Sequence, residues 1–236
     1  MISIKVVFHS VPLLSGKTFR NMDSFEKSAG WCLIISSILM VLTMALHPAG
    51  GSIDYLIKIS TVIIITHSMA ITTVPISLFG FWGLTKRLEQ SYSLAFGAFF
   101  VIATALFAVM IAAALNGLAL PFFLANLEPS EASTDMAKQI LWYNMSLNHG
   151  FDYIYIGGSC VAVILYSLAV IKTKRMPAWI AYAGIVLTVV AIILLAAGFV
   201  FVDLHGFRYF VFGFVAWVLM AGIQLIRSAA AVTNPQ

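Results

Sequence analysis

Four of the five histidines lie near one end of the chain's apolar segments, each with a different segment. His47 closes the first apolar run, His67 lies inside the second, His149 precedes the fourth and His205 precedes the sixth. Several imidazoles with a carboxylate form the ligand set of zinc, copper or non-haem iron, and two imidazoles on facing helices also hold a haem iron. We therefore take these four histidines and Asp203 as candidate metal ligands, with a bare ion and a single haem both left open.

Two further polar residues at similar depth are the candidate catalytic residues. Asn116 lies near the end of the third apolar run and Asp152 begins the fourth. Because a polar side chain inside a membrane span is costly, both are expected to face the interior of a helix bundle or a wet cavity. Asp152 is expected to act as a ligand or proton acceptor, and Asn116 as a donor to a substrate or to a ligand. Asn148, Asp152, Tyr155 and Ser159 follow helical spacing along one face.

Each of these residues, taken alone, also has a simpler interpretation. A histidine at the water interface costs little, as with His47 and His205. One hydrogen bond to a backbone carbonyl would satisfy His67, and Asn116 alone is typical of a contact between helices. The chain has no HExxH, no CxxCH and no tightly spaced histidine pair. The shared depth of these residues is what favours one joint site, and whether the chain is an enzyme stays open.

The composition requires lipid as the solvent for most of the surface. Of the 236 residues, 61% are hydrophobic and 9% are charged, and the mean hydropathy is +1.01. A soluble domain carries about 25% charged residues. The net charge of +4 comes from basic residues in short loops between apolar runs, which is a pattern of membrane topology. No nucleic-acid partner is expected, and the lipid bilayer is the expected environment.

Six apolar runs are long enough to cross a membrane as helices. They cover Gly30–Leu46, Ile59–Leu84, Leu94–Leu118, Phe151–Ile171, Ala178–Phe201 and Tyr209–Ile226. The sequence therefore predicts an all-α integral membrane protein, a single six-transmembrane-helix bundle over residues 29–228. A cytoplasmic leader over residues 1–28 and a tail over residues 229–236 flank it. Pro75 predicts a kink in the second span.

The distribution of Lys and Arg predicts that both termini lie in the cytoplasm. Of the 13 basic residues, ten fall in the N-terminal segment, the second and fourth loops and the tail, and three fall on the other side. This predicts a multi-pass protein of a bacterial inner (cytoplasmic) membrane. The four candidate histidines then lie towards its extracytoplasmic face. The largest outer connection offers Ser133, Thr134 and Asp135 as caps, followed by a short extracytoplasmic helix from Met136 to Leu147 before the fourth span. This helix is expected either to run along the outer interface or to extend the fourth span outwards.

A weak repeat marks the three helices that enter from the outside. Two five-residue segments are nearly identical, His149-Gly150-Phe151-Asp152-Tyr153 and His205-Gly206-Phe207-Arg208-Tyr209. A third segment, Gly51-Ser52-Ile53-Asp54-Tyr55, resembles them less closely. Glycine and aromatic residues are common at membrane interfaces, so chance recurrence is the alternative. The match places Asp152 and Arg208 at corresponding depths, where we expect them to pair.

Three functions are compatible with these features. The first is a metal- or haem-dependent membrane protein that works at the extracytoplasmic face, on a lipid or a small apolar molecule. The second is a small-molecule transporter, although the inner halves of the spans lack His, Asp, Glu and Asn. The third is a non-catalytic subunit or assembly factor of a membrane complex, or a homo-oligomer, because small residues in the fifth span suit helix docking.

Overall fold

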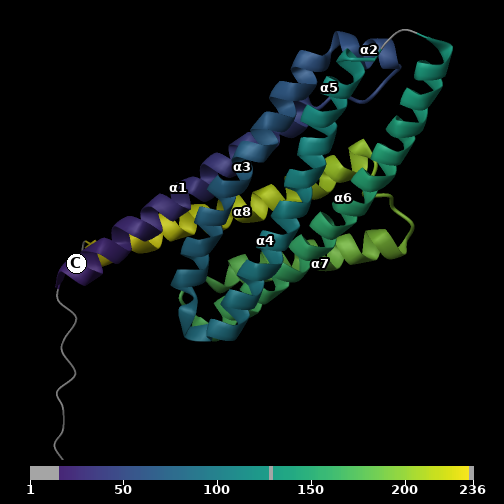
Figure 1. Ribbon diagram of the computed structural model, residues 1–236. Helices are drawn as coiled ribbons and strands as arrows, with labels where there is room; N and C mark the ends of the chain where they lie inside the picture. The colour runs from purple at the N-terminus through teal and green to yellow at the C-terminus, as the bar shows by residue number, and fades with distance from the viewer. Residues whose placement is uncertain (1–15, 128–129, 234–236) are drawn as a thin grey trace, which may run out of the picture.

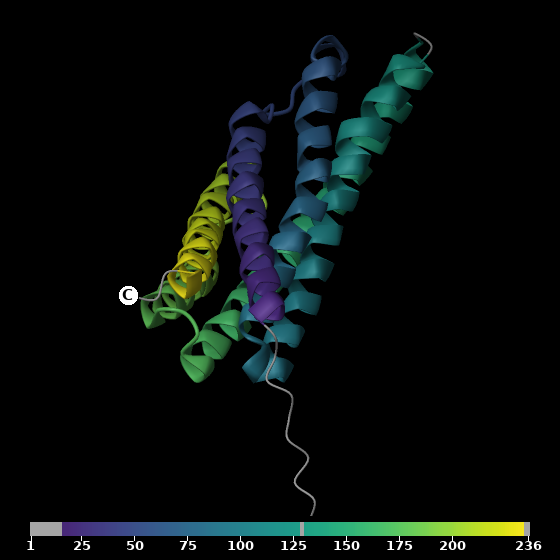
Figure 2. The same ribbon diagram turned by 90° about the vertical axis from the view of Figure 1, so that its left-hand side faces the viewer.

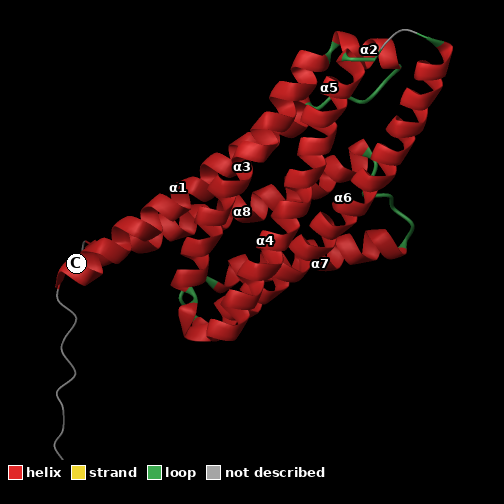
Figure 3. Ribbon diagram, in the orientation of Figure 1, coloured by secondary structure: helices red, strands yellow, loops and turns green. Residues whose placement is uncertain are grey.

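The computed structural model describes residues 16–127 and 130–233, and this part of the chain is helical without any strand (Figure 3). Short connections join the helices. The elements, in chain order, are α1 (Gly16–Leu46), α2 (Ile53–Lys58), α3 (Ser60–Arg87), η1 (Glu89–Ser91), α4 (Tyr92–Ala114), the π-helical turn η2 (Leu115–Ala119), α5 (Leu120–Ala125), α6 (Glu131–Thr173), α7 (Ala178–Ala196) and α8 (Leu204–Thr233).

Six helical segments of the described chain are long and apolar enough to cross a membrane, which confirms the predicted number of spans. They are Ser24–Leu46, Ser60–Arg87, Glu89–Ala125, Ser133–Thr173, Ala178–Ala196 and Leu204–Ser228. The chain is therefore a multi-pass membrane protein by its architecture. We call the end of the bundle that holds His47 the histidine end, and the end that holds Arg87 and Arg175 the arginine end.

The six spans form a closed ring in which most neighbours in the sequence are neighbours in space. Helix α1 packs between α3 and α8, α4 packs between α3 and α6, and α7 lies against α6 and α8. Figure 1 labels these helices in a side view of the bundle, and Figure 2 shows α1 alongside α8. Close approach of α1 and α8 depends on glycine, because a side chain at Gly30 would lie 2.7 Å from the carbonyl oxygen of Gly222.

Aromatic side chains fill the centre of the ring. Phe81 of α3 lies 5.9 Å from Tyr166 of α6 and 6.4 Å from Phe214 of α8, measured between ring centroids. Trp217 is buried beside them and donates its indole N–H to the carbonyl of Ile180 on α7 at 3.1 Å. These rings join α3, α6, α7 and α8 into one core, so the middle of the bundle is packed.

A buried ion pair closes the arginine end. Glu26 of α1 is 5% exposed, and Nη1 of Arg87 on α3 lies 3.2 Å from its carboxylate. Arg87 also donates its Nε–H to the carbonyl of Arg175, in the connection between α6 and α7, at 3.3 Å. The guanidinium of Arg87 on α3 thus contacts both α1 and the connection between α6 and α7.

Helix α6 is the largest departure from the predicted boundaries. It begins at Glu131 and runs for 43 residues, about 65 Å, whereas the hydrocarbon core of a bilayer is about 30 Å thick. The helix predicted from Met136 to Leu147 is the first part of α6, so of the two alternatives it is the extension of the fourth span. Ser130 is its N-cap and forms a capping box with Ser133, so the helix starts before the caps that the sequence predicted.

The ends of three other spans differ from the predicted ends for local reasons. The third span continues beyond Leu118 through η2 into α5. The fifth span ends at Ala196 rather than Phe201, because the chain turns at Gly198, whose φ of +86° suits glycine. The sixth span begins before Tyr209, because the Asp203 carboxylate accepts the backbone N–H of Gly206 at 2.5 Å and caps α8.

The predicted leader and tail lie partly outside the described residues. Residues 1–15 and 234–236 are outside them, and the rest of the leader forms the start of α1. Helix α3 continues through Pro75.

Candidate functional site

The rings of His47 and His67 meet at the histidine end. His47 follows the last residue of α1, and His67 lies on α3; their ring centroids are 4.9 Å apart with the planes inclined by 57°. His67 is 7% exposed. These two of the predicted ligands are brought together, from segments twenty residues apart on neighbouring helices.

Both imidazoles are oriented by backbone carbonyls. Nδ1 of His67 lies 2.8 Å from the carbonyl oxygen of Ile63, and Nδ1 of His47 lies 3.0 Å from that of Pro48. A carbonyl only accepts, so each Nδ1 carries the hydrogen. Burial lowers the pKa of His47 to about 4, and the neighbouring His67 ring acts in the same direction. A neutral ring with Nδ1–H has a free lone pair on Nε2, which is the form that binds a metal.

Arg208 holds the end of α1 in place. Its Nε donates to the carbonyl of Met44 at 3.1 Å and its Nη2 donates to the carbonyl of His47 at 2.9 Å. The last carbonyls of a helix have no partner within the helix, and a cation there also suits the helix dipole. Arg208, on α8, therefore fixes the segment that presents His47. The predicted pair of Arg208 with Asp152 is wrong, since both groups have other partners.

The π-helical turn η2 supports the second imidazole. Gly117 lies directly against His67, and a Cβ atom at position 117 would overlap the Cβ and Cγ atoms of His67. Pro121, two residues after η2, has no N–H to donate to the carbonyl of Gly117 four residues earlier. Such π-turns inside α-helices occur frequently at functional sites. Here the turn allows α3 and the α4–α5 segment to approach closely.

A chain of side-chain amides runs beside this turn and ends on a carboxylate. Asn144 donates to Asn116 at 2.5 Å, Asn116 donates to Asn148 at 2.7 Å, and Asn148 donates to Asp152 at 2.8 Å. Asn116 also donates to the carbonyl of Ala112. We call Asn144, Asn116 and Asn148 the asparagine ladder. Because a carboxylate only accepts, Asp152 sets the orientation of every amide in it.

The members of this hydrogen-bonded chain that lie on α6 are one helical turn apart. Asn144, Asn148 and Asp152 are four residues apart and so share one face of the helix, towards η2. Asn116, Asn148 and Asp152 were expected from the sequence to lie at the site, whereas Asn144 and Gly117 were not. The spacing of four would have identified Asn144, whereas nothing in the sequence marks Gly117 as the contact of His67.

The remaining predicted ligands lie apart from the histidine pair. His149 and His205 are exposed, and Asp203 is the exposed cap of α8. Among the residues that the structure describes, no group of three or more His, Cys, Asp and Glu side chains is placed to hold one metal ion. A single ligand set drawn from all the predicted residues is therefore not supported.

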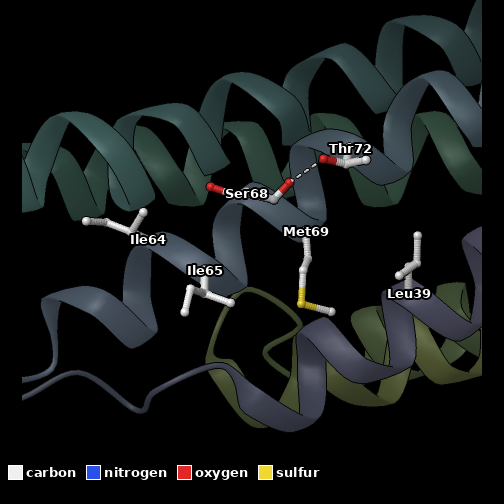
Figure 4. Close-up of a pocket in the computed structure, with 6 residues that line it drawn as sticks. All are labelled: Leu39, Ile64, Ile65, Ser68, Met69 and Thr72. Atoms are coloured by element: carbon white, nitrogen blue, oxygen red, sulfur yellow. Dashed lines mark hydrogen bonds between the residues drawn. The ribbon is translucent and has the colours of Figure 1, made fainter.

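A shallow groove lies on the outside of the bundle next to the histidine pair. It has a volume of about 340 Å³ and is lined by Leu39, Ile64, Ile65, Ser68, Met69 and Thr72, from α1 and α3 (Figure 4). Its Thr72 hydroxyl donates to the carbonyl of Ser68 at 2.8 Å, so the groove offers mainly apolar surface. Ser68 and Met69 directly follow His67.

Comparisons with protein-family models, with curated proteins and with solved structures found no match to this chain. Its functional interpretation therefore rests on the geometry of the histidine end.

Proposed function

We propose that this chain is a multi-pass membrane protein that binds one transition-metal ion through His47 and His67, on the extracytoplasmic side. The single observation that carries the proposal is the orientation of the two rings. Each gives its Nδ1 hydrogen to a backbone carbonyl beside a second such ring, and within residues 16–127 and 130–233 neither Nε2 has a hydrogen-bond partner. Metal-binding histidines almost always donate their other ring N–H in this way.

The distance between the rings favours a bare ion over a haem. With metal–nitrogen bonds of about 2.0 Å, each ring centroid would lie about 3.2 Å from the metal. Centroids 4.9 Å apart then correspond to an angle of about 100° at the metal, close to the tetrahedral value of about 109°. Two axial haem ligands would instead need centroids about 6.4 Å apart, on opposite sides of the iron.

Imidazole ligands suit zinc, copper and iron, and two positions of a four-coordinate ion would stay open to water or a substrate. An ion with open positions polarises a bound group or activates a bound water. The apolar groove beside His67 favours a lipid or another small apolar molecule as the substrate. The extracytoplasmic location follows from the excess of Lys and Arg at the arginine end.

The test is metal binding by the purified protein in lipid nanodiscs. Wild type, stripped with chelator and then titrated with Zn²⁺, Cu⁺ and Fe²⁺, is expected to bind one equivalent of at least one of them. His67→Gln and His47→Gln should each weaken binding strongly, while the matched exposed variants His149→Gln and His205→Gln should bind as wild type does. Binding that is absent in wild type, or equally reduced in His205→Gln, would overturn the proposal. Size-exclusion profiles show that each variant is folded.

A further inference from the structure

Two buried carboxylates of the described chain, Glu26 and Asp152, differ in their surroundings: Glu26 forms an ion pair, whereas Asp152 does not. Glu26 and Asp152 are 5% and 6% exposed. Glu26 has the Arg87 guanidinium 3.2 Å away. For Asp152, no Lys, Arg or His nitrogen lies within 4.0 Å in the described part of the chain. Its one hydrogen bond there comes from Asn148, to Oδ2.

One hydrogen bond does not balance the cost of burying this charge. Removing an unpaired carboxylate from water is costly even after relaxation, and more so in a membrane. A single hydrogen bond to a charged acceptor offsets only part of that cost. The balance requires a positive charge at Asp152 that the described residues do not supply.

The ionisable groups around Asp152 do not change this balance. On α6 itself, Tyr155 is buried and carries no positive charge, whereas His149 and Tyr153 are exposed and His149 forms no ion pair with Asp152. On α8, His205 is exposed and Arg208 directs its donors to the end of α1. The parts of α4, η2 and α7 at this end contain no ionisable side chain.

We propose that Asp152 is the binding site of a monovalent cation, a proton or an alkali-metal ion, which enters from the histidine end along the asparagine ladder. The proton and the metal ion share one chemistry here, a single positive charge on the carboxylate. When a proton binds, it leaves a hydronium ion of the solvent: one O–H bond of the hydronium breaks as an O–H bond forms at Oδ1, the oxygen that receives no hydrogen bond from the described residues. A water molecule is released and the charge of the side chain goes from −1 to 0.

The ladder suits this role because all its amides point the same way. Each bonded amide N–H is directed along the ladder towards Asp152, and the side-chain oxygens of Asn116 and Asn148 each accept the amide before them. The side-chain oxygen of Asn144, at the outer end, accepts no hydrogen bond from the described residues, so an incoming cation first meets an open oxygen atom. Beyond Asp152 the same face of α6 continues into Tyr155, which is surrounded by the rings of Phe207, Phe210 and Phe214. The cation therefore enters and leaves at the same end, and the site is one for binding rather than passage.

Infrared spectroscopy and thermal unfolding distinguish the two cations. Protein in nanodiscs is first studied with a large organic cation as the only salt. If the ligand is a proton, wild type shows the C=O stretching band of a protonated carboxyl group, and Asp152→Asn lacks it. If the ligand is an alkali-metal ion, Na⁺ or K⁺ raises the unfolding temperature of wild type but not that of Asp152→Asn. The control Asp135→Asn, at an exposed carboxylate paired with Lys138, should behave as wild type in both arms.

Either signal, lost in Asp152→Asn and kept in the control, supports the proposal. Absence of both signals in folded wild type overturns it, as does equal loss in Asp135→Asn. Should Asp152→Asn fail to fold, Asn116→Leu interrupts the ladder and leaves the carboxylate in place; it is expected to slow uptake of the cation after a jump in pH or salt. None of these measurements depends on metal binding by the histidine pair, so the two proposals fail separately.

Discussion

Replacing Gly117 with alanine tests the contact that supports the histidine pair. An added Cβ would overlap the Cβ of His67, and that atom is fixed to the backbone of α3, so no rotamer change relieves the contact. Overpacking of this kind costs about 1–3 kcal/mol, and a rigid neighbour favours the upper value. We expect η2 to move away from α3, so that Gly117→Ala lowers the free energy of unfolding.

Gly157→Ala is the matched control. Gly157 also lies inside a helix, but a Cβ there meets no atom within 4 Å. Alanine is the better helix former by up to about 1 kcal/mol at either position, so this gain cancels when the two variants are compared. The difference between them then isolates the overlap with His67, and we expect it to be about 3 kcal/mol.

The assay is reversible unfolding in mixed micelles, with helix content followed by circular dichroism. Equal stability of Gly117→Ala and Gly157→Ala would show that η2 and α3 are not in contact as described. If the histidine pair binds a metal ion, Gly117→Ala should also bind it more weakly than Gly157→Ala, because the displaced turn no longer holds the ring of His67.

Three further outcomes are expected in the same unfolding assay. Arg208→Lys should lower stability by about 1.5–3 kcal/mol, since an ammonium cannot serve both carbonyls at the end of α1, whereas the exposed Arg227→Lys on the same helix should change little. Glu26→Gln should cost about 1.5–3 kcal/mol, because it removes the negative charge beside the half-buried Arg87 guanidinium, which keeps the Arg175 carbonyl as a partner. Glu89→Gln, in an exposed pair, should cost less than about 1 kcal/mol. In chelator-treated protein, the free energy of unfolding should fall as the pH drops from 6.5 towards 4. The folded state holds the pKa of His47 at about 4, so the unfolded chain takes up the proton first. His47→Gln should make the free energy of unfolding less dependent on pH in this range.

The sequence alone determined the class of fold and the depth of the polar residues. Six apolar runs of membrane length dictate six helices, because a backbone in lipid must satisfy its own hydrogen bonds. The same apolar background makes every polar side chain conspicuous, so His67, Asn116 and Asp152 could be identified before any contact was known. Helix ends were less predictable: Gly198 and the caps Ser130 and Asp203 set them through local backbone geometry.

Which polar residues contact one another depends on the tertiary structure. Depth along a helix does not fix the direction in which a side chain points, and six helices of similar composition can be arranged around a ring in many ways. His47 and His67 face each other because α1 and α3 are neighbours and Gly117 leaves room for the ring. Asp152 pairs with an asparagine instead of the predicted arginine, because α6 turns that face towards η2, while the donors of Arg208 go to the end of α1.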